Sequence, residues 1–267
     1  MAILTISRQF GSRGRDVCHG VVKELGYEFL DKEKLLGELT KKGTKWVKWG
    51  SGLDEHSPSI WERFDWSFRA FGALIKCLIL EYASRDNVVI MGRGSNFILR
   101  DVSYSFRIRV VAPLEKRIET IMIRDNVDYQ TASWLVKRTD EDRRRFLAVL
   151  YGINWDDPSS YDAVFDSSER STDEIVRVCC DTLLTKNLLK TDLEEKTLHM
   201  RTAAAGLEAE LLTDPSLFLF NLDVSIEKNH IVVEGTVRNP KHKKKIEQRA
   251  LHLAPGYNIV FRLHYRV

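Results

Sequence analysis

The stretch SRQFGSRGRDV, residues 7–17, follows the apolar run AILTI at residues 2–6 and leads into a helical pattern. A strand, a glycine-containing turn and a helix in this order are typical of loops that hold phosphate groups. Such a loop needs glycines, so that the backbone turns tightly with its N–H groups pointing inward, and the positive end of a helix behind them. The sequence therefore predicts a phosphate-binding loop, whose members are Gly11, Ser12, Arg13, Gly14, Arg15 and Asp16.

The loop departs from the Walker A pattern G-x-x-x-x-G-K-[ST] at two positions. Arg15 stands where a lysine is expected, and Asp16 stands where a hydroxyl residue is expected. Arginine can clamp phosphate because its planar fork binds two oxygens. The missing hydroxyl normally ligates magnesium, and we expect Ser12 to replace it in part. An ordinary Gly-Ser turn between a strand and a helix has the same short pattern.

Short apolar strands alternate with helices over the first 190 residues. The expected strands are 2–6, 27–30, 87–92, 105–112 and 163–166, and the expected helices are 14–25, 32–41, 60–84, 114–125, 129–150 and 171–188. The polar, Gly-rich segment 43–58 is expected to be a loop or flap. This alternation predicts an α/β fold with a parallel sheet flanked by helices. Functional residues in such folds lie beyond the carboxyl ends of the strands, where Asp31 and Arg93 are expected.

The segment VKRTDEDRRRFLAV, residues 136–149, carries a second signal. Arg138, Asp142 and Arg145 stand at i, i+4 and i+7, so they share one face of the expected helix, and Arg143 and Arg144 point elsewhere. Two guanidiniums beside one carboxylate suit a mobile lid that neutralises transferring phosphate oxygens. A solvated helix with ordinary ion pairs explains the same spacing.

Six segments in the same order resemble the cytidylate kinase-like proteins of the P-loop nucleoside monophosphate kinase group. They are ISRQFGSRGRDV at 6–17, LGYEFLDKE at 25–33, VVIMGRGSNFIL at 88–99, VVAPLEKRI at 110–118, R-x-x-x-D-x-x-R at 138–145 and FDSSERSTDEIV at 165–176. The resemblance covers residues 1–188. It implies a three-layer P-loop kinase fold with a helical lid, ATP as phosphoryl donor and Mg²⁺ as the accompanying ion.

The resemblance also implies a role for each matching position. Loop 11–15 holds the donor phosphates, with Arg15 as the catalytic cation, and Arg93 grips the acceptor phosphate. Arg138, Asp142 and Arg145 form the catalytic lid. Asp31 lies near the acceptor or the magnesium. Together with Ser12 of the loop, Asp31 is therefore a candidate metal ligand. Asp31 is equally suited to cap the helix that follows it.

The acceptor side departs from the family pattern. Lys32-Glu33-Lys34 follows Asp31 where the family has a Ser/Thr-Gly motif, and Gly94 replaces an acid after Arg93. Nucleotide-like phosphate binding is therefore better supported than cytidine as the acceptor base.

After residue 190 the pattern changes. A helix at 193–212, two alternating strands within 221–239, a basic helix at 240–253 and a final strand predict a small α+β domain with antiparallel pairing. We place the domains at 1–190 and 196–267. The second resembles, weakly, a BON domain, which implies a small ligand, a lipid surface or a protein as its partner. The cations between Arg238 and Arg249 either meet an acidic surface or form the solvated face of a helix whose Ile246, Ala250, Leu251 and Leu253 pack on the sheet.

Composition excludes several classes of protein. The chain has 267 residues, 43% of them hydrophobic and 30% charged, which favours a folded core over disorder. A net charge of +3 is no strong nucleic-acid signal. The four cysteines have no metal-binding C-x-x-C spacing, and no apolar run approaches a membrane span. We expect a cytoplasmic location.

The leading hypothesis is ATP-dependent phosphoryl transfer to a small phosphorylated acceptor, a nucleoside monophosphate. The alternative is a nucleotide-binding sensor with weak or no catalysis, whose C-terminal domain reports to a partner or ligand. A kinase for an acceptor that is not a nucleotide is a third possibility.

Overall fold

The computed structural model describes residues 2–43, 46, 65–217 and 219–265. By their contacts the residues form two units: unit 1 is Met1–Arg63 with Arg85–Thr191, and unit 2 is Phe64–Ser84 with Asp192–Val267. Apart from Gly43 and Trp46, the expected loop at 43–58 lies outside the described residues, as does the start of the helix expected at 60–84.

Unit 1 is built on a parallel sheet with the strand order β2-β3-β1-β4-β5. Its strands are β1 (Ile3–Arg8), β2 (Glu28–Leu30), β3 (Val88–Met91), β4 (Ser105–Val111) and β5 (Ala163–Asp166). Ile6 of the central strand β1 lies opposite Met91 and Ile108. The predicted α/β class and parallel pairing are confirmed.

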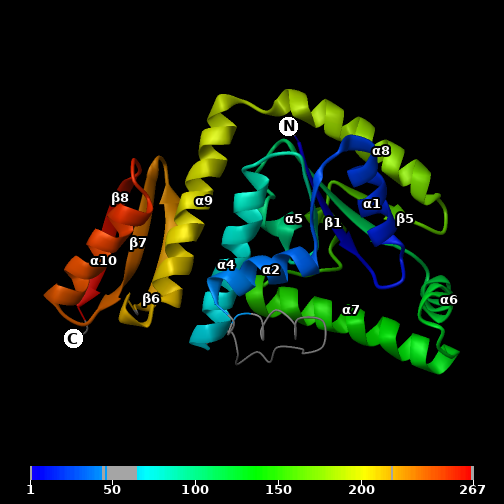
Figure 1. The fold of residues 1–267 in the computed structure, drawn as a ribbon, viewed down its shortest axis with the longest axis horizontal. Coiled ribbons are helices and arrows are strands. Elements are labelled where there is room, and N and C mark those ends of the chain that lie inside the picture. Colours follow the sequence, from blue (N-terminus) through cyan, green and yellow to red (C-terminus); the bar gives the residue numbers. More distant parts are fainter. Residues whose placement is uncertain (1, 44–45, 47–64, 218, 266–267) are drawn as a thin grey trace. The chain divides into compact units, whose positions relative to one another are not determined.

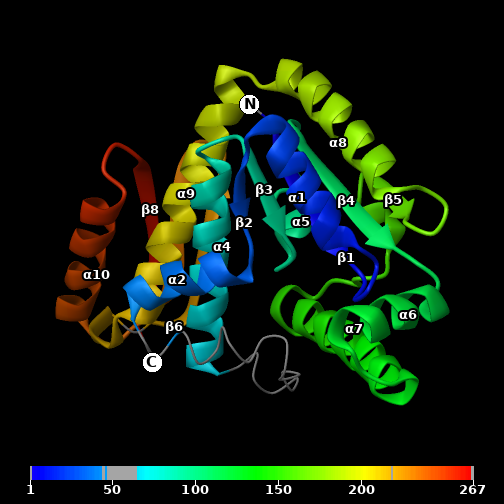
Figure 2. The same cartoon turned by 45° about the vertical axis from the view of Figure 1, so that its right-hand side comes forward.

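Helices connect these strands. They are α1 (Gly14–Leu25), α2 (Lys32–Lys42), α5 (Ser95–Ile98), α6 (Leu114–Asp125), α7 (Tyr129–Tyr151) and α8 (Thr172–Lys186), with single turns of 3₁₀-helix at Pro158–Ser160 and Asn187–Leu189. α1 and α8 pack together against the sheet, with Val21 of α1, Leu183 of α8 and Ile108 of β4 in one buried cluster. Figures 1 and 2 show both helices beside the strands.

The helix ends follow local rules. Gly26 ends α1 in the left-handed region at φ +67°, where glycine has no steric penalty. Asp128 caps α7 by accepting a hydrogen bond from the amide of Thr131, and Ser171 and Glu174 form a capping box on α8. Because these signals lie in the sequence itself, most helix boundaries fall close to those expected.

Unit 2 contains a three-stranded sheet in the order β6-β7-β8. Its elements are α4 (Trp66–Ala83), α9 (Asp192–Thr213), a 3₁₀ turn at Pro215–Leu217, β6 (Phe220–Glu227), β7 (His230–Val237), α10 (Pro240–Leu253) and β8 (Asn258–Tyr265). β6 and β7 are antiparallel, but β7 and β8 are parallel. The expected antiparallel pairing therefore holds for β6 and β7 but not for β8, because α10 forms a crossover that returns the chain in the same direction.

Helix α4 belongs to unit 2 although it lies within the first half of the sequence. α4 packs along α9, and Lys76 Nζ lies 2.9 Å from Glu208 Oε2. Arg69 also donates to the carbonyl of Leu222 at 2.9 Å. These contacts place 64–84 with the C-terminal segment, and the domain limits 1–190 and 196–267 stay a prediction.

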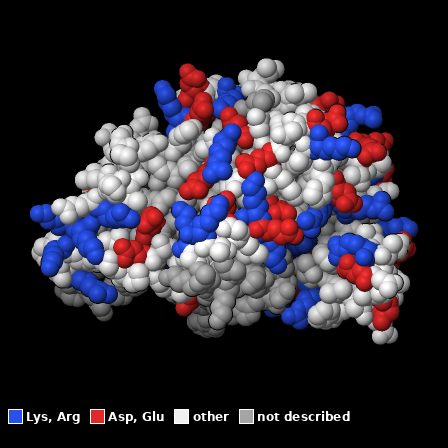
Figure 3. Space-filling view, in the orientation of Figure 1, with Lys and Arg blue, Asp and Glu red and all other residues white. Residues whose placement is uncertain are grey.

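Helix α10 presents its cations to solvent. Figure 3 shows Lys and Arg side chains gathered where α10 lies in Figure 1. Ile246 and Ala250 are buried as expected, whereas Leu251 is 55% exposed and does not pack on the sheet. The described part of the chain contains no helix of sufficient length and apolar character for a membrane span.

Candidate functional site

The loop between β1 and α1 can form only with glycine at two positions. Gly11 has φ +82°, and a Cβ atom there would lie 2.7 Å from the carbonyl oxygen of Arg117. At Gly14 a Cβ atom would lie 2.5 Å from the Cβ atom of Arg8. Arg13, the residue before α1, adopts φ +58° in the left-handed region. The chain therefore turns tightly here and brings loop backbone close to the end of β1.

This turn leaves backbone N–H groups available to a ligand. Among the described residues, the amides of Gly11, Arg13, Gly14 and Arg15 have no protein acceptor. They precede or begin the 12-residue helix α1, whose N-terminus carries partial positive charge. Successive amides at a left-handed turn before a helix form a binding site for anions such as phosphate.

Ser12 does not lie where a metal ligand is needed. Its side chain is buried, and its hydroxyl lies 2.8 Å from the carbonyl oxygen of Gln9 and 3.0 Å from that of Val110, to which it donates. These bonds hold the loop against β4. The expectation that Ser12 replaces the Walker A hydroxyl is corrected: its oxygen faces the protein backbone.

Arg15 and Asp31 lie at the mouth of the loop. One guanidinium nitrogen of Arg15 lies 3.6 Å from Asp31 Oδ2 and 3.9 Å from Glu33 Oε1. Asp31 also caps α2, since its Oδ1 accepts a hydrogen bond from the amide of Lys34. The capping alternative for Asp31 is therefore confirmed, and its second oxygen faces Arg15.

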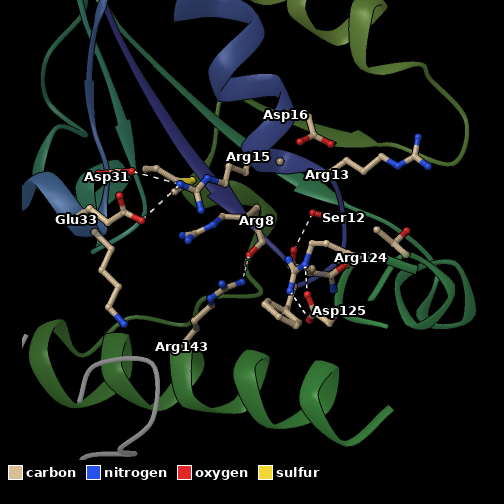
Figure 4. A pocket seen from close by; sticks show the side chains of 17 residues that line it. Arg8, Ser12, Arg13, Arg15, Asp16, Asp31, Glu33, Arg124, Asp125 and Arg143 are labelled. Carbon is tan, nitrogen blue, oxygen red and sulfur yellow. Dashed lines mark hydrogen bonds and ion pairs between the residues drawn. The ribbon is translucent and has the colours of Figure 1, made fainter. Parts of the chain in front are cut away.

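These residues line a cavity of about 450 Å³ at the carboxyl end of β1. Figure 4 shows Arg143 directed at Arg8, and Arg15 directed at Asp31 and Glu33. The cationic lining is Arg8, Arg13, Arg15, Lys32, Arg124 and Arg143, and the acidic lining is Asp16, Asp31, Glu33 and Asp125. Arginines around unpaired amides suit a polyanion with several phosphate groups.

Helix α7 faces the cavity with residues other than the expected lid set. Arg143 lines the cavity and donates to the carbonyl of Arg8 at 2.9 Å, whereas Arg138, Asp142 and Arg145 do not line it. Arg145 is paired with Glu141 at 2.9 Å. Arg143 lies on another face of α7 than Arg138, Asp142 and Arg145, as expected, and it is the face of Arg143 that meets the cavity.

A buried ion pair sets this orientation of α7. Asp140 Oδ2 lies 2.5 Å from a guanidinium nitrogen of Arg117, and both side chains are 9% exposed. Asp140 Oδ1 accepts a hydrogen bond from the loop amide of Phe10 at 2.8 Å. Arg117 also donates to the carbonyl of Phe10. α6, α7 and the loop are thereby joined beside the ends of β1 and β4, as Figure 2 shows.

Arg93 lies in a second, small cavity of about 30 Å³. Gly92, Arg93 and Gly94 have φ values of +76°, +59° and +74°, three consecutive left-handed residues at the end of β3. The other lining residues are Ser7, Arg8, Asn96, Arg143, Phe146, Leu147 and Trp155. Arg93 thus shares a cavity with Arg8 and Arg143 but not with Arg15.

A third cavity, of about 570 Å³, opens on the other side of the loop. It shares Gly11, Arg13, Asp16, Thr120 and Arg124 with the main cavity and adds Lys116, Ser167 and Ser168 among others. Hydrogen bonds from Arg124 hold the pKa of Asp125 below its ordinary value, so this carboxylate stays charged. The main cavity therefore shares lining residues with each of the other two cavities.

Five lining residues of the main cavity were not predicted as site residues from the sequence. They are Arg8, Lys32, Arg124, Asp125 and Arg143. Arg8 offered a signal, because it ends the buried strand immediately before the loop. Arg143 offered a weaker signal: it stands three positions after Asp140, the spacing of neighbours on a helix surface, so the two side chains could be expected on the same face of α7.

A family model described as the cytidylate kinase-like family matches residues 3–169. The chain belongs to this family. The matched region contains the loop, the sheet and helix α7 of unit 1, and it ends before α9, so the BON resemblance of the C-terminal segment stays a prediction.

Similar proteins agree with this membership. A cytidylate kinase of Pyrobaculum aerophilum is 27% identical over 183 residues, covering 68% of this chain and 92% of that protein. A cytidylate kinase of Saccharolobus islandicus is 26% identical over 201 residues, covering 74% and 98%. The crystal structure of an uncharacterized protein from Eubacterium ventriosum aligns with a TM-score of 0.54 at 21% identity, covering 69% of this chain and 98% of that one, which bears on the fold alone. The predicted P-loop kinase fold, with a small further sheet at the C-terminus, is confirmed.

Proposed function

We propose that this cytidylate kinase-like protein transfers the γ-phosphoryl group of ATP to a nucleoside monophosphate. The observation that carries the proposal is the loop 11–15, whose unpaired amides open into a cavity lined by arginines. Phosphoryl transfer needs little covalent chemistry from a protein, and it depends on positioning and on neutralising the charge of the phosphate oxygens.

The three neighbouring cavities support a division between donor and acceptor, because the main one shares lining residues with each of the others. The 570 Å³ space has room for the donor nucleoside, and Gly11 and Arg13 of the loop line it. The second cavity, with Arg93 at the end of β3, suits the acceptor phosphate. Its volume of about 30 Å³ is too small for a phosphate group, so acceptor binding requires Arg93 or its neighbours to move.

The residues present fit ATP better than they fit a protein-held metal ion. Loop amides and guanidiniums match its phosphates, but the described residues contain no group of three side chains suited to a metal ion, and Ser12 faces the backbone. Asp16 and Asp31 contribute carboxylates to the lining of the cavity. Mg²⁺ bound to ATP would supply charge neutralisation, and Asp16 or Asp31 would be the residue to hold it.

The orientation of Ser12 and the presence of Asp16 favour a second candidate function. A protein that binds nucleotide without turnover needs the loop amides but no metal-binding hydroxyl. A nucleotide sensor would use unit 2, with its exposed basic helix α10, to engage a partner or ligand.

Two measurements separate these functions. Calorimetric titration with ATP and with ADP measures binding, and ADP release is followed with CMP, dCMP, UMP, AMP and GMP as acceptors. Turnover with one of these acceptors that is lost in Arg15→Ala supports the kinase. Binding without turnover on any acceptor supports the sensor, and no nucleotide binding refutes both.

A further inference from the structure

Two arginines line both the main cavity and the small cavity beside β3. They are Arg8, at the end of β1, and Arg143 of α7. Arg15 and Arg13 line the main cavity but not the small one, and Arg93 lines the small cavity but not the main one. Arg8 and Arg143 therefore stand at the boundary between the spaces assigned above to the donor phosphates and to the acceptor phosphate.

Neighbouring residues determine where the side chain of Arg8 lies. A Cβ atom on Gly92 would lie 2.5 Å from one guanidinium nitrogen of Arg8, and a Cβ atom on Gly14 would lie 2.5 Å from its Cβ atom. Arg143 donates to the carbonyl of Arg8 at 2.9 Å. Gly14 and Gly92 leave room for the side chain of Arg8, and the bond from Arg143 holds its carbonyl. The guanidinium therefore lies close to the backbone of Gly92, at the end of β3. Figure 4 shows its side chain in the middle of the cavity, between the loop and α7.

The group that crosses this boundary in the proposed reaction is the phosphoryl group. Its three equatorial oxygens share the developing charge, and a planar guanidinium can donate to two of them. Arg15 is less suited to this task, because it is turned toward Asp31 and Glu33 at the outer edge of the loop and is more than half exposed. Arg8 lies at the junction and comes from the central strand of the sheet.

We propose that Arg8 is a catalytic residue that contacts the transferring phosphoryl group, an inference that rests on the proposed kinase function. An oxygen of the acceptor phosphate supplies the electron pair of the new P–O bond. The electron pair of the broken bond leaves with ADP, and Arg8 stays protonated throughout. Its guanidinium stabilises the charge of the group in flight, so its contribution falls on turnover more than on ATP binding.

The test compares Arg8→Met and Arg8→Lys with Arg177→Met, an exposed arginine of α8 remote from the three cavities. Loss of a charge-stabilising group aimed at the transition state lowers kcat by ~10²–10³-fold, which we expect for Arg8→Met. Arg8→Lys keeps the charge without the fork and should lose less. The dissociation constant of ADP, measured by calorimetry, should stay close to that of the unchanged protein in both variants and in Arg177→Met.

A glycine pair tests the same geometry from the other side of the contact. Gly92→Ala should displace Arg8 and lower kcat as Arg8→Met does. Gly26→Ala has a comparable φ of +67° but no atom within 4 Å of the new Cβ, so it carries the backbone strain without the clash and should leave kcat unchanged. Circular dichroism on each variant separates a local effect from loss of the fold.

These measurements separate the role of Arg8 from the proposed kinase activity. Unchanged kcat in folded Arg8→Met, or a loss of ADP affinity equal to its loss of kcat, overturns the role of Arg8 and leaves the kinase standing. If the unchanged protein has no turnover with any acceptor, the proposed function fails and the role of Arg8 fails with it. A kcat loss in both Arg8→Met and Gly92→Ala, with ADP binding retained, supports the inference.

Discussion

Asp140→Asn tests the buried ion pair that joins α7 to the loop. Asp140 and Arg117 have side chains that are each 9% exposed and lie 2.5 Å apart. The asparagine keeps an acceptor for the amide of Phe10 but leaves the Arg117 guanidinium buried without a counter-charge. Removing one partner of a buried pair destabilises proteins by about 3–5 kcal/mol. We expect Asp140→Asn to lower the free energy of unfolding by an amount near the lower end of this range. Asp140→Ala should lower it by about 1–3 kcal/mol more, because the Phe10 amide then also loses its acceptor.

The measurement is the free energy of unfolding from urea titration at neutral pH. Glu141→Gln is the matched control, since Glu141 is the next residue of α7, carries ion pairs to Arg144 and Arg145, and is 43% exposed. Exposed pairs contribute about 0.2–1 kcal/mol, so its loss should be several times smaller. The double variant Arg117→Met with Asp140→Asn should lose less than the sum of the single variants. Equal losses for Asp140→Asn and Glu141→Gln would refute the reasoning.

Three further predictions follow from the structure. Arg143→Met should lower kcat more than Arg145→Met, measured by ADP release, because Arg143 lines the cavity and Arg145 does not. A larger loss in Arg145→Met would contradict this and favour the face of α7 that was expected from the sequence. Burial raises the pKa of Asp162, but hydrogen bonds from Arg107 outweigh it and hold that pKa below its ordinary value, so the stability from this group is complete above about pH 4 and is lost as the pH falls through the lowered pKa. Asp162→Asn should therefore destabilise the protein at pH 7 and lose that effect in strong acid, as urea titrations at both pH values would show. Burial raises the pKa of the Cys18 thiol to about 12, and all four cysteines are buried, so a thiol reagent at pH 8 should label them only after unfolding; rapid labelling of the native protein would contradict this burial.

The strands and helices of unit 1 could be predicted because their signals are local. Apolar runs mark the strands, and residues such as Gly26 and Asp128 mark helix ends by their own conformational preferences. The position of the loop follows from the same local order, since it comes between β1 and α1. Glycine at positions 11 and 14 was correctly read as a requirement of a tight turn.

The face of α7 that meets the cavity could not be predicted in the same way. Helical periodicity tells which residues share a face of α7, but it does not tell which face meets the site. That choice depends on Asp140 and Arg117, which are 23 positions apart and come together only in the folded chain. The direction of the Ser12 hydroxyl likewise depends on the carbonyl of Val110, 98 positions away.

Unit 2 shows the same limit at the level of whole elements. Local pattern predicted its helices and strands, whereas strand direction followed from the crossover through α10. The grouping of α4 with α9 depends on pairs such as Lys76 and Glu208, 132 positions apart. No short-range pattern marks these contacts.

The central claim is that the cavity at loop 11–15 transfers a phosphoryl group between nucleotides. Its most direct test is incubation of the protein with ATP labelled on the γ-phosphate, Mg²⁺ and each nucleoside monophosphate in turn, followed by separation of the products. We expect label to appear on one or more nucleoside diphosphates, and we expect Arg8→Met to slow its appearance. Label that stays on ATP with every monophosphate, in a protein that binds ATP, would contradict it.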